Sequence, residues 1–253
     1  VERLADELGI NSETLLSKTE SIVHGTTVAT NALLERKGAK TGLLTTLGHR
    51  DVLEMREGLK DDRYNMRLPA PAPLVPRFLR LGVRERIKPD GSIHTKLDNT
   101  SLDEAINKLR EEKVTSVAVC YLHAYKEPKH EQETKQILEA KLPGVSVSIS
   151  SEVFPEIKEY ERVSTTIVNA YVRPIVENYL NRLEERLKNA GYKGSVLIIL
   201  SHGGVAPIEE AIRLSAATVL SGPAGGVAGS KYGASLIGAG DLVPFDMGGT
   251  STD

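Results

Sequence analysis

Short apolar runs alternate with amphipathic helical patterns along most of the chain, an order typical of α/β folds with mainly parallel strands. The apolar runs that predict strands lie at residues 21–24, 41–45, 117–122, 145–149 and 196–200. The helical stripes between them lie at residues 26–37, 101–109, 128–142, 155–191 and 208–214. Buried parallel strands are continuous apolar runs in sequence, so this pattern predicts a sheet covered by helices.

Local signals predict where several elements begin and end. Gly38 is placed to end the first of these helices, and Ser101 with Glu104 forms a capping-box pattern at the start of another. Between residues 80 and 97, apolar positions alternate with basic ones around a Pro-Asp-Gly-Ser turn, which predicts a hairpin with a solvated basic face. A soft boundary near residue 165 divides the chain into regions 1–165 and 166–253.

Composition excludes several function classes. The chain has 253 residues, 40% apolar and 26% charged, with a net charge of −2, which is ordinary for a globular protein. This charge gives no overall attraction to nucleic acid or anionic membrane, and no apolar run approaches the ~20 residues that span a bilayer. One cysteine, Cys120, lies in a predicted buried strand, so we expect an inert thiol and a cytoplasmic location.

The last eight residues carry the strongest candidate chemistry. Asp246 ends a predicted apolar strand at 242–245, and a glycine pair, three hydroxyl residues and a second acid follow: Gly248, Gly249, Thr250, Ser251, Thr252 and Asp253. Consecutive N–H groups in a glycine turn bind anions, and carboxylates suit Mg²⁺ held through water and phosphate oxygens. An ordinary strand-to-hairpin turn is the alternative.

Two further segments have small or hydroxyl residues where a helix begins. His24, Thr26 and Thr27 lie between a predicted strand and helix, with Asn31 one turn further on. Gly222 and Gly225 open another helix. Helix N-termini attract anions, but a capping turn with a hydrogen-bonded His24, and close packing of small residues at Gly222, explain these segments equally well.

Acidic residues gather near residues 152–161, where a helix is predicted to begin. Acids in a first turn complement the helix dipole, and this is the simpler interpretation. Glu156, Arg162 and Asn169 are the alternative candidates for a substrate-binding surface. The histidine spacing predicts no transition-metal site, and the chain contains no P-loop sequence.

Four segments, in order, resemble the hydantoinase A/5-oxoprolinase family. They are residues 23–35, 151–171, 221–226 and the Asp-x-Gly-Gly-Thr-x-Thr-Asp motif at 246–253. The resemblance implies an incomplete actin-, Hsp70- and sugar-kinase-like (ribonuclease H-like) ATPase fold with an inserted α/β subdomain. Family members carry an earlier copy of the last motif and continue past it, so the resemblance also implies an internal fragment.

The resemblance implies Mg-ATP and phosphorylation of a carbonyl oxygen in a cyclic amide (hydantoin, 5-oxoproline) or ketone. Asp246 and Asp253 would hold Mg²⁺ and act in catalysis with His24, and the glycines and hydroxyls named above would contact phosphate. It further implies a hydantoinase B-type partner subunit or domain, an oligomer, and weak or absent turnover by this chain alone. A different actin-like-fold ATPase, a sugar-kinase-like enzyme, and an inactive fragment without nucleotide binding are the alternatives.

Overall fold

The computed structural model describes residues 1–58, 62, 64–68 and 71–247, and these form two compact units. Unit 1 consists of residues 1–37 and everything from residue 175 onward, and unit 2 is the insertion between them, residues 38–174. Helix α8 (Glu159–Asn189) contributes its first half to unit 2 and its second half to unit 1. The boundary expected near residue 165 therefore falls inside this helix.

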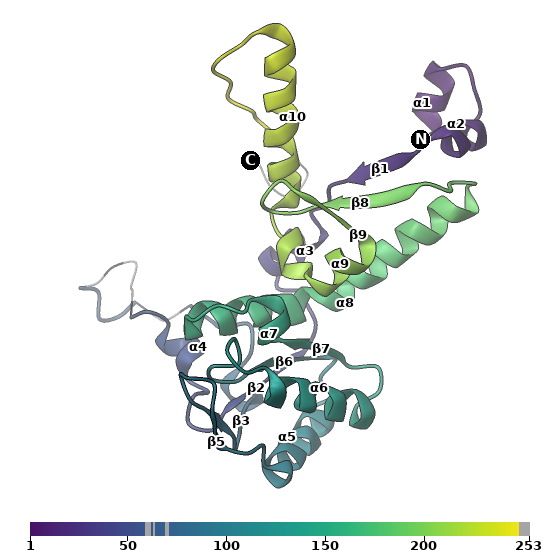
Figure 1. The fold of residues 1–253 in the computed structure, drawn as a ribbon. Coiled ribbons are helices and arrows are strands. Elements are labelled where there is room, and N and C mark those ends of the chain that lie inside the picture. The colour runs from purple at the N-terminus through teal and green to yellow at the C-terminus, as the bar shows by residue number, and fades with distance from the viewer. Residues whose placement is uncertain (59–61, 63, 69–70, 248–253) are drawn as a thin grey trace. The chain divides into compact units, whose positions relative to one another are not determined.

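Unit 2 is built on a four-stranded parallel sheet of order β3-β2-β6-β7 (Figure 1). Its strands are β2 (Thr41–Thr46), β3 (Arg80–Val83), β6 (Ser116–Cys120) and β7 (Ser146–Ile149), with a separate hairpin of β4 (Arg86–Ile87) and β5 (Ile93–Thr95). Its remaining helices are α4 (Val52–Met55), η1 (Arg77–Leu79), α5 (Asn99–Glu111), α6 (Lys129–Lys141) and α7 (Ser150–Val153).

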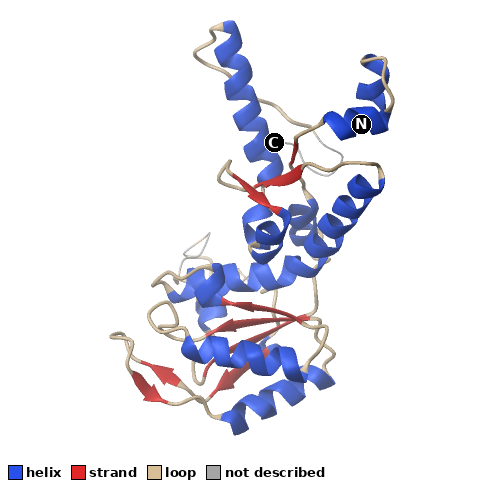
Figure 2. Ribbon diagram, turned by 45° about the vertical axis from the view of Figure 1, so that its right-hand side comes forward, coloured by secondary structure: helices blue, strands red, loops and turns tan. Residues whose placement is uncertain are grey.

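Helices cover both faces of the sheet in unit 2. Figures 1 and 2 show α5 and α6 on one face and the first half of α8 on the other. Every residue of β2 and β6 is buried, and the core includes Leu109 of α5, Leu138 of α6 and Ile167 of α8. Burial on both faces explains why these two strands are continuous runs of apolar and small residues rather than alternating patterns.

Unit 1 contains a three-stranded sheet of order β1-β8-β9, in which β1 and β8 are parallel and β9 is antiparallel to β8. The strands are β1 (Ser21–His24), β8 (Ser195–Ile199) and β9 (Val205–Pro207). Its helices, besides the second half of α8, are α1 (Glu2–Glu7), α2 (Ser12–Lys18), α3 (Val28–Leu34), α9 (Ile208–Arg213), η2 (Ser215–Thr218) and α10 (Ser221–Ile237).

The predicted hairpin at residues 80–97 is wrong in its first half. Residues 80–83 form β3, which pairs in parallel with β2, and only the short β4 and β5 form a hairpin. Arg80, expected on a solvated face, is completely buried and donates to the Val75 carbonyl oxygen at 2.9 Å and to Glu54 at 3.1 Å. Alternation alone misled the prediction, because a buried arginine with hydrogen-bond partners has the same sequence pattern as an exposed one.

Two residues that the sequence predicted as helix caps, Ser101 and Gly38, do not cap these helices in the structure. Asp98, not Ser101, caps α5, since its side chain accepts from the Thr100 N–H at 3.2 Å. Arg36, not Gly38, takes the left-handed conformation after α3, with φ of 52°. Gly38 is required for another reason: a Cβ there would overlap the ring of Tyr171.

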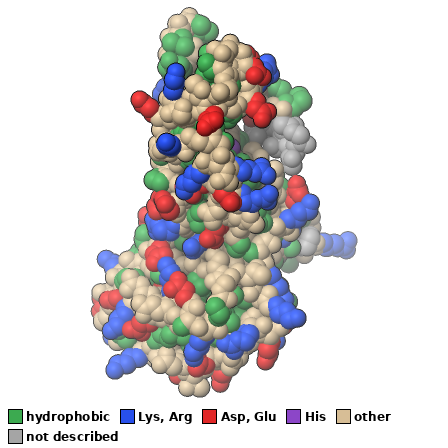
Figure 3. Space-filling view, turned by 90° about the vertical axis from the view of Figure 1, so that its right-hand side faces the viewer, with side chains coloured by type: hydrophobic (Ala, Val, Ile, Leu, Met, Phe, Trp, Pro, Cys, Tyr) green, Lys and Arg blue, Asp and Glu red, His purple; other side chains and the backbone are tan. Residues whose placement is uncertain are grey.

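The surface carries charges of both signs. Figure 3 shows Lys and Arg side chains interspersed with Asp and Glu on the visible face, in keeping with the small net charge. Among the helices of the described ranges, none is long and apolar enough to cross a membrane.

Candidate phosphate-binding site and family

Two glycine-containing segments that lie almost 200 residues apart in sequence meet in unit 1. The first follows β1 and leads into α3, and the second is the start of α10. The Ser221 hydroxyl donates to the Thr26 carbonyl oxygen at 3.0 Å, and the Leu220 N–H donates to the Thr30 hydroxyl at 2.9 Å. Ser221 is completely buried and Thr26 nearly so. These two bonds join the beginning of α3 to the beginning of α10.

The glycines allow this close approach. A Cβ on Gly222 would lie 3.3 Å from the Thr27 methyl carbon, and one on Gly225 would lie 2.9 Å from Cδ1 of Ile199 on β8. Gly25 packs against the start of α10, since a Cβ added to Gly25 would lie 3.9 Å from the Ser221 carbonyl oxygen. The predicted packing role of these glycines is therefore present, and it is compatible with an anion site.

Helix α10 begins without a side-chain cap. Leu220 precedes it with φ of 60°, a left-handed conformation that is unusual for leucine, and no side chain of the described residues accepts from the first turn. The first N–H groups of a helix have no acceptor within the helix, so an uncapped start offers donors to an anion. Gly222 belongs to this first turn, and Thr27, which is exposed, lies against it.

His24 ends β1 and contacts the second half of α8. Its Nε2 lies 2.8 Å from the Tyr179 hydroxyl, and the two rings stack with centroids 5.8 Å apart. Partial burial lowers the pKa of His24, which favours the neutral ring. Asn31, one turn into α3, donates to the Thr27 hydroxyl at 3.3 Å.

The carboxyl-terminal motif is described only at its start. Asp246 is exposed, whereas Gly248, Gly249, Thr250, Ser251, Thr252 and Asp253 lie outside the described residues. The strand expected at 242–245 does not form: residues 241–246 have no regular structure, and Val243 and Phe245 are 93% and 72% exposed. An apolar run becomes a strand only when a neighbouring strand pairs with it, and none of the described strands does.

Three of the four substrate-side candidates, all except Asn31, belong to unit 2, and two of these three are buried. Arg162 is 1% exposed and donates to the carbonyl oxygens of Tyr121, at 2.9 Å, and Glu156, at 3.1 Å. Asn169 is completely buried and donates to the Ser148 hydroxyl at 3.1 Å. Glu156 itself is exposed and contributes its backbone carbonyl rather than its carboxylate to the contact with Arg162.

Sequence reasoning missed three participants in unit 1: Thr30, Tyr179 and the hydroxyl of Ser221. Tyr179 lies within the predicted helical stripe at residues 155–191, and nothing in the sequence indicates the partner of its hydroxyl. Ser221 was part of a recognised segment, but only the fold reveals that its hydroxyl reaches back to Thr26.

The backbone N–H groups at the start of α10 and the nearby threonine hydroxyls are suitable donors to a phosphate. The described residues offer few ligands for a metal ion. Over the described ranges, no three His, Cys, Asp or Glu side chains come together as a metal site. The exposed carboxylate of Asp246 is compatible with Mg²⁺ held through water and phosphate oxygens, which needs few protein ligands.

The fold defines the chain as part of an actin-like ATPase fold. Its mixed α/β structure matches nucleotide-free acetone carboxylase with a TM-score of 0.89 and 28% identity, over 99% of this chain and 37% of that one. It matches the ATP-dependent caprolactamase of Pseudomonas jessenii with a TM-score of 0.85 and 37% identity, over 99% of this chain and 36% of that one.

The chain belongs to the hydantoinase/oxoprolinase family, as the four ordered motifs indicated. The family's N-terminal region matches residues 1–142, and its hydantoinase/oxoprolinase model matches residues 162–253. Caprolactamase subunit alpha of Pseudomonas jessenii is 38% identical over 99% of the chain, and 5-oxoprolinase 1 of Arabidopsis thaliana is 33% identical over 93%. The chain spans 36% of the first relative and 20% of the second.

Proposed function

We propose that the whole protein is an ATP-dependent enzyme that phosphorylates a carbonyl oxygen of a cyclic amide, such as hydantoin or 5-oxoproline, or of a ketone. The relatives support the class, since they include an ATP-dependent caprolactamase, 5-oxoprolinases and ketone carboxylases. ATP supplies the phosphoryl group, which makes the carbonyl carbon reactive toward hydrolysis or carboxylation. The protein's part in such transfer is positioning and neutralisation of charge.

The observation that carries this proposal is the junction of α3 and α10. The bond from Ser221 to the Thr26 carbonyl holds two helix starts together, and the uncapped start of α10 presents backbone N–H groups. We assign phosphate contacts to Thr26, Thr27, Gly222 and Gly225, and to the motif residues Gly248, Gly249, Thr250, Ser251 and Thr252.

The remaining roles extend the same proposal. We assign Mg²⁺ binding to Asp246 and Asp253 and a catalytic role to His24, whose pKa is lowered by burial. Asn31, Glu156, Arg162 and Asn169 are the substrate-side candidates. Several relatives are named as subunits, such as caprolactamase alpha and acetone carboxylase beta. We therefore propose that a hydantoinase B-type subunit or domain completes the reaction in a cytoplasmic oligomer.

Steady-state assays of the full-length protein test the proposal. We expect ATP hydrolysis driven by 5-oxoproline, hydantoin or a ketone, and not by sugars. Gly222→Val places a branched side chain where the Cβ already meets Thr27 at 3.3 Å, and we expect kcat/KM to fall by about a hundredfold, as misplaced reacting groups do. Gly229→Val is the matched control, because this glycine of α10 has nothing within 4 Å of its Cβ.

Other outcomes would favour the alternatives. Turnover stimulated by sugars would identify a sugar-kinase-like enzyme. Calorimetry of the 253-residue chain with Mg-ATP adds an independent test: no binding, together with no turnover by the full-length protein, would point to a protein without nucleotide chemistry. If Gly222→Val and Gly229→Val had equal effects on kcat/KM, the α3–α10 junction would not be part of the site. We expect the 253-residue chain by itself to turn over weakly or not at all.

A further inference from the structure

A second candidate site lies wholly within unit 2, whereas the glycine-containing segments belong to unit 1. A cavity of about 510 Å³ opens at the edge where the parallel strands end. His49 follows β2, Arg86 follows β3 and His123 follows β6, and all three line it. Residues 158–161, around the start of α8, form another wall. Its volume is within the range of small-molecule sites.

The strand order makes this edge a switch point. The chain leaves β2 toward β3 on one side, and leaves β6 toward β7 on the other. Since such crossovers are right-handed, the segments that leave β2 and β6 lie on opposite faces of the sheet. A crevice therefore opens between the ends of β2 and β6, which is where open α/β sheets bind ligands.

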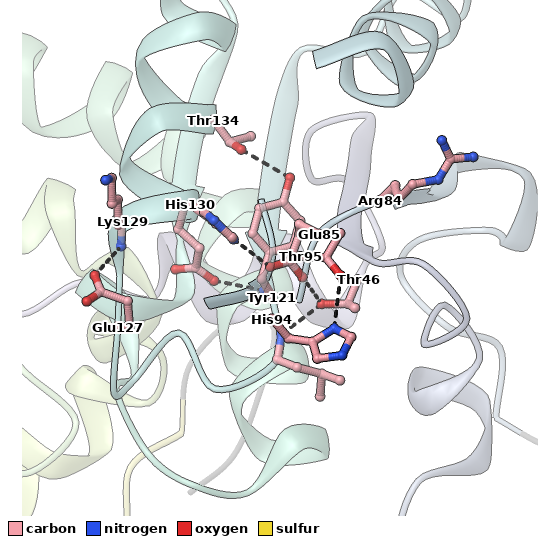
Figure 4. A network of polar contacts seen from close by, with 12 residues as sticks. Thr46, Arg84, Glu85, His94, Thr95, Tyr121, Glu127, Lys129, His130 and Thr134 are labelled. Atoms are coloured by element: carbon pink, nitrogen blue, oxygen red, sulfur yellow. Dashed lines mark hydrogen bonds and ion pairs between the residues drawn. The ribbon is translucent and has the colours of Figure 1, made fainter. Parts of the chain in front are cut away.

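A buried polar network holds this edge in place (Figure 4). The Thr46 hydroxyl, at the end of β2, accepts from the Leu122 N–H at 2.9 Å and donates to the Glu85 carboxylate. The other Glu85 oxygen accepts from Nδ1 of His130, on α6, at 2.8 Å. Glu85 and His130 are each 3% exposed. Hydrogen bonds thus hold Glu85, which precedes Arg86, and Leu122, which precedes His123.

Some of the charged side chains that line the cavity have ion-pair partners and others do not. Lys158 lies 2.9 Å from Glu161 and 3.8 Å from Glu57, so it is occupied by two carboxylates. Arg56 and Arg86 are half-buried, and in the described ranges neither guanidinium has a hydrogen-bond or ion-pair partner. Glu159 likewise has no ion-pair partner among the described side chains. The cavity therefore presents two unpaired cations and one unpaired carboxylate.

The neighbouring geometry also indicates a binding surface. His123 and Arg56 have positive φ angles, 56° and 53°; such strain in residues other than glycine gathers at functional sites. The Nδ1 atom of His49 is buried without a hydrogen-bond partner. Burial lowers the pKa of His123, with Glu159 opposing and Arg86 reinforcing the shift, which places both charges within electrostatic reach of this ring.

We propose that this cavity binds an amino-carboxylate, a small molecule with a carboxylate at one end and an ammonium group at the other. The carboxylate pairs with Arg86 and Arg56, the ammonium pairs with Glu159, and the apolar side chains of Val52, Met55 and Leu122 contact the carbon chain between them. Phosphate is disfavoured, because its second negative charge would meet three glutamates. The site stands without the proposed function, since no nucleotide is involved.

Titrations of the 253-residue chain without ATP test this assignment, with the side-chain NMR signals of His49 and His123 as the local readout. The probes are linear amino acids from β-alanine to 6-aminohexanoate, with hexanoate and hexylamine as partners that lack one charge each. We expect at least one amino acid to shift both histidine signals and to bind about tenfold or more tightly than hexanoate or hexylamine. A hydrogen bond to a charged group contributes enough binding free energy for a tenfold difference in affinity.

Two variants separate the ends of the ligand. Arg86→Gln should weaken amino-acid binding about tenfold to a hundredfold and leave hexylamine unchanged, and Glu159→Gln should leave hexanoate unchanged. Arg84→Gln is the matched control, since Arg84 is exposed, pairs with Asp98 at 3.2 Å and lies outside the cavity. Histidine signals that respond to none of the probes, or hexanoate binding as tightly as 6-aminohexanoate, would overturn the proposal while leaving the proposed ATP chemistry intact.

Discussion

Replacing Arg162 by methionine separates a structural role for this residue from the substrate-binding role that its sequence context suggested. The guanidinium is buried, donates to two backbone carbonyl oxygens, and lies over the Tyr125 ring with 5.3 Å between Cζ and the ring centroid. Methionine keeps much of the aliphatic volume and removes every donor. The carbonyl oxygens of Tyr121 and Glu156 would then lose these bonds.

The expected cost follows from these contacts. Hydrogen bonds from a charged donor contribute about 1.5–3 kcal/mol each, so the two bonds together amount to about 3–6 kcal/mol. Removing a buried charge returns part of its desolvation cost. We expect a net loss of about 2–4 kcal/mol in the free energy of unfolding, a large share of the 5–15 kcal/mol that is typical of a folded domain.

Urea unfolding followed by circular dichroism measures this loss. Arg182→Met is the control, because Arg182 lies exposed on the same helix and should change stability by less than about 0.5 kcal/mol. A change of that small size for Arg162→Met, combined with lost substrate-dependent turnover in the full-length protein, would refute the structural reasoning. That result would favour the proposed substrate-side role of Arg162 alone.

Three further outcomes are expected. The pKa of His24 is lowered by burial, so its contribution to stability is present above pH 6.5 and is lost as pH falls below that value; NMR titration of the ring should show a depressed pKa that rises toward the ordinary value in Tyr179→Ala, which removes the stacked ring. Burial raises the pKa of the Cys120 thiol to about 11, so a thiol reagent at pH 8 should label the chain only after denaturant is added, and rapid native labelling would contradict this. Gly194→Ala should destabilise the chain by about 1–3 kcal/mol in thermal unfolding, because its Cβ would overlap a backbone carbonyl oxygen, whereas Gly229→Ala, which has open space, should be neutral or stabilising.

Local patterns predicted most of the regular elements. The strands β2, β6 and β7 and the helices α5 and α6 lie within a few residues of their predicted positions, because strand burial and helical amphipathicity depend on nearby residues. Gly191 ends the long helix with φ of 89°, as its position after the apolar stripe indicated.

Features that depend on a distant partner could not be predicted in this way. Arg80 and Arg162 resemble surface residues in sequence, but each is buried and donates to a group far along the chain, the Glu54 carboxylate for Arg80 and the Tyr121 carbonyl oxygen for Arg162. Asn169 is buried for a similar reason, against Ser148. No sequence motif marks the cavity beside His49 and His123, because its walls come from four separate stretches of unit 2.

The amino-acid sequence by itself determined the α/β character, most element positions and, through four ordered motifs, membership of the hydantoinase/oxoprolinase family. Only the tertiary structure decided that β3 pairs with β2 instead of forming a long hairpin, that the start of α10 bonds to the segment after β1, and which polar residues are buried. The physical reason is the range of the interactions. Periodicity and capping act within a few residues, whereas strand pairing, glycine-mediated contact and the burial of polar groups depend on atoms that folding brings together from distant parts of the chain.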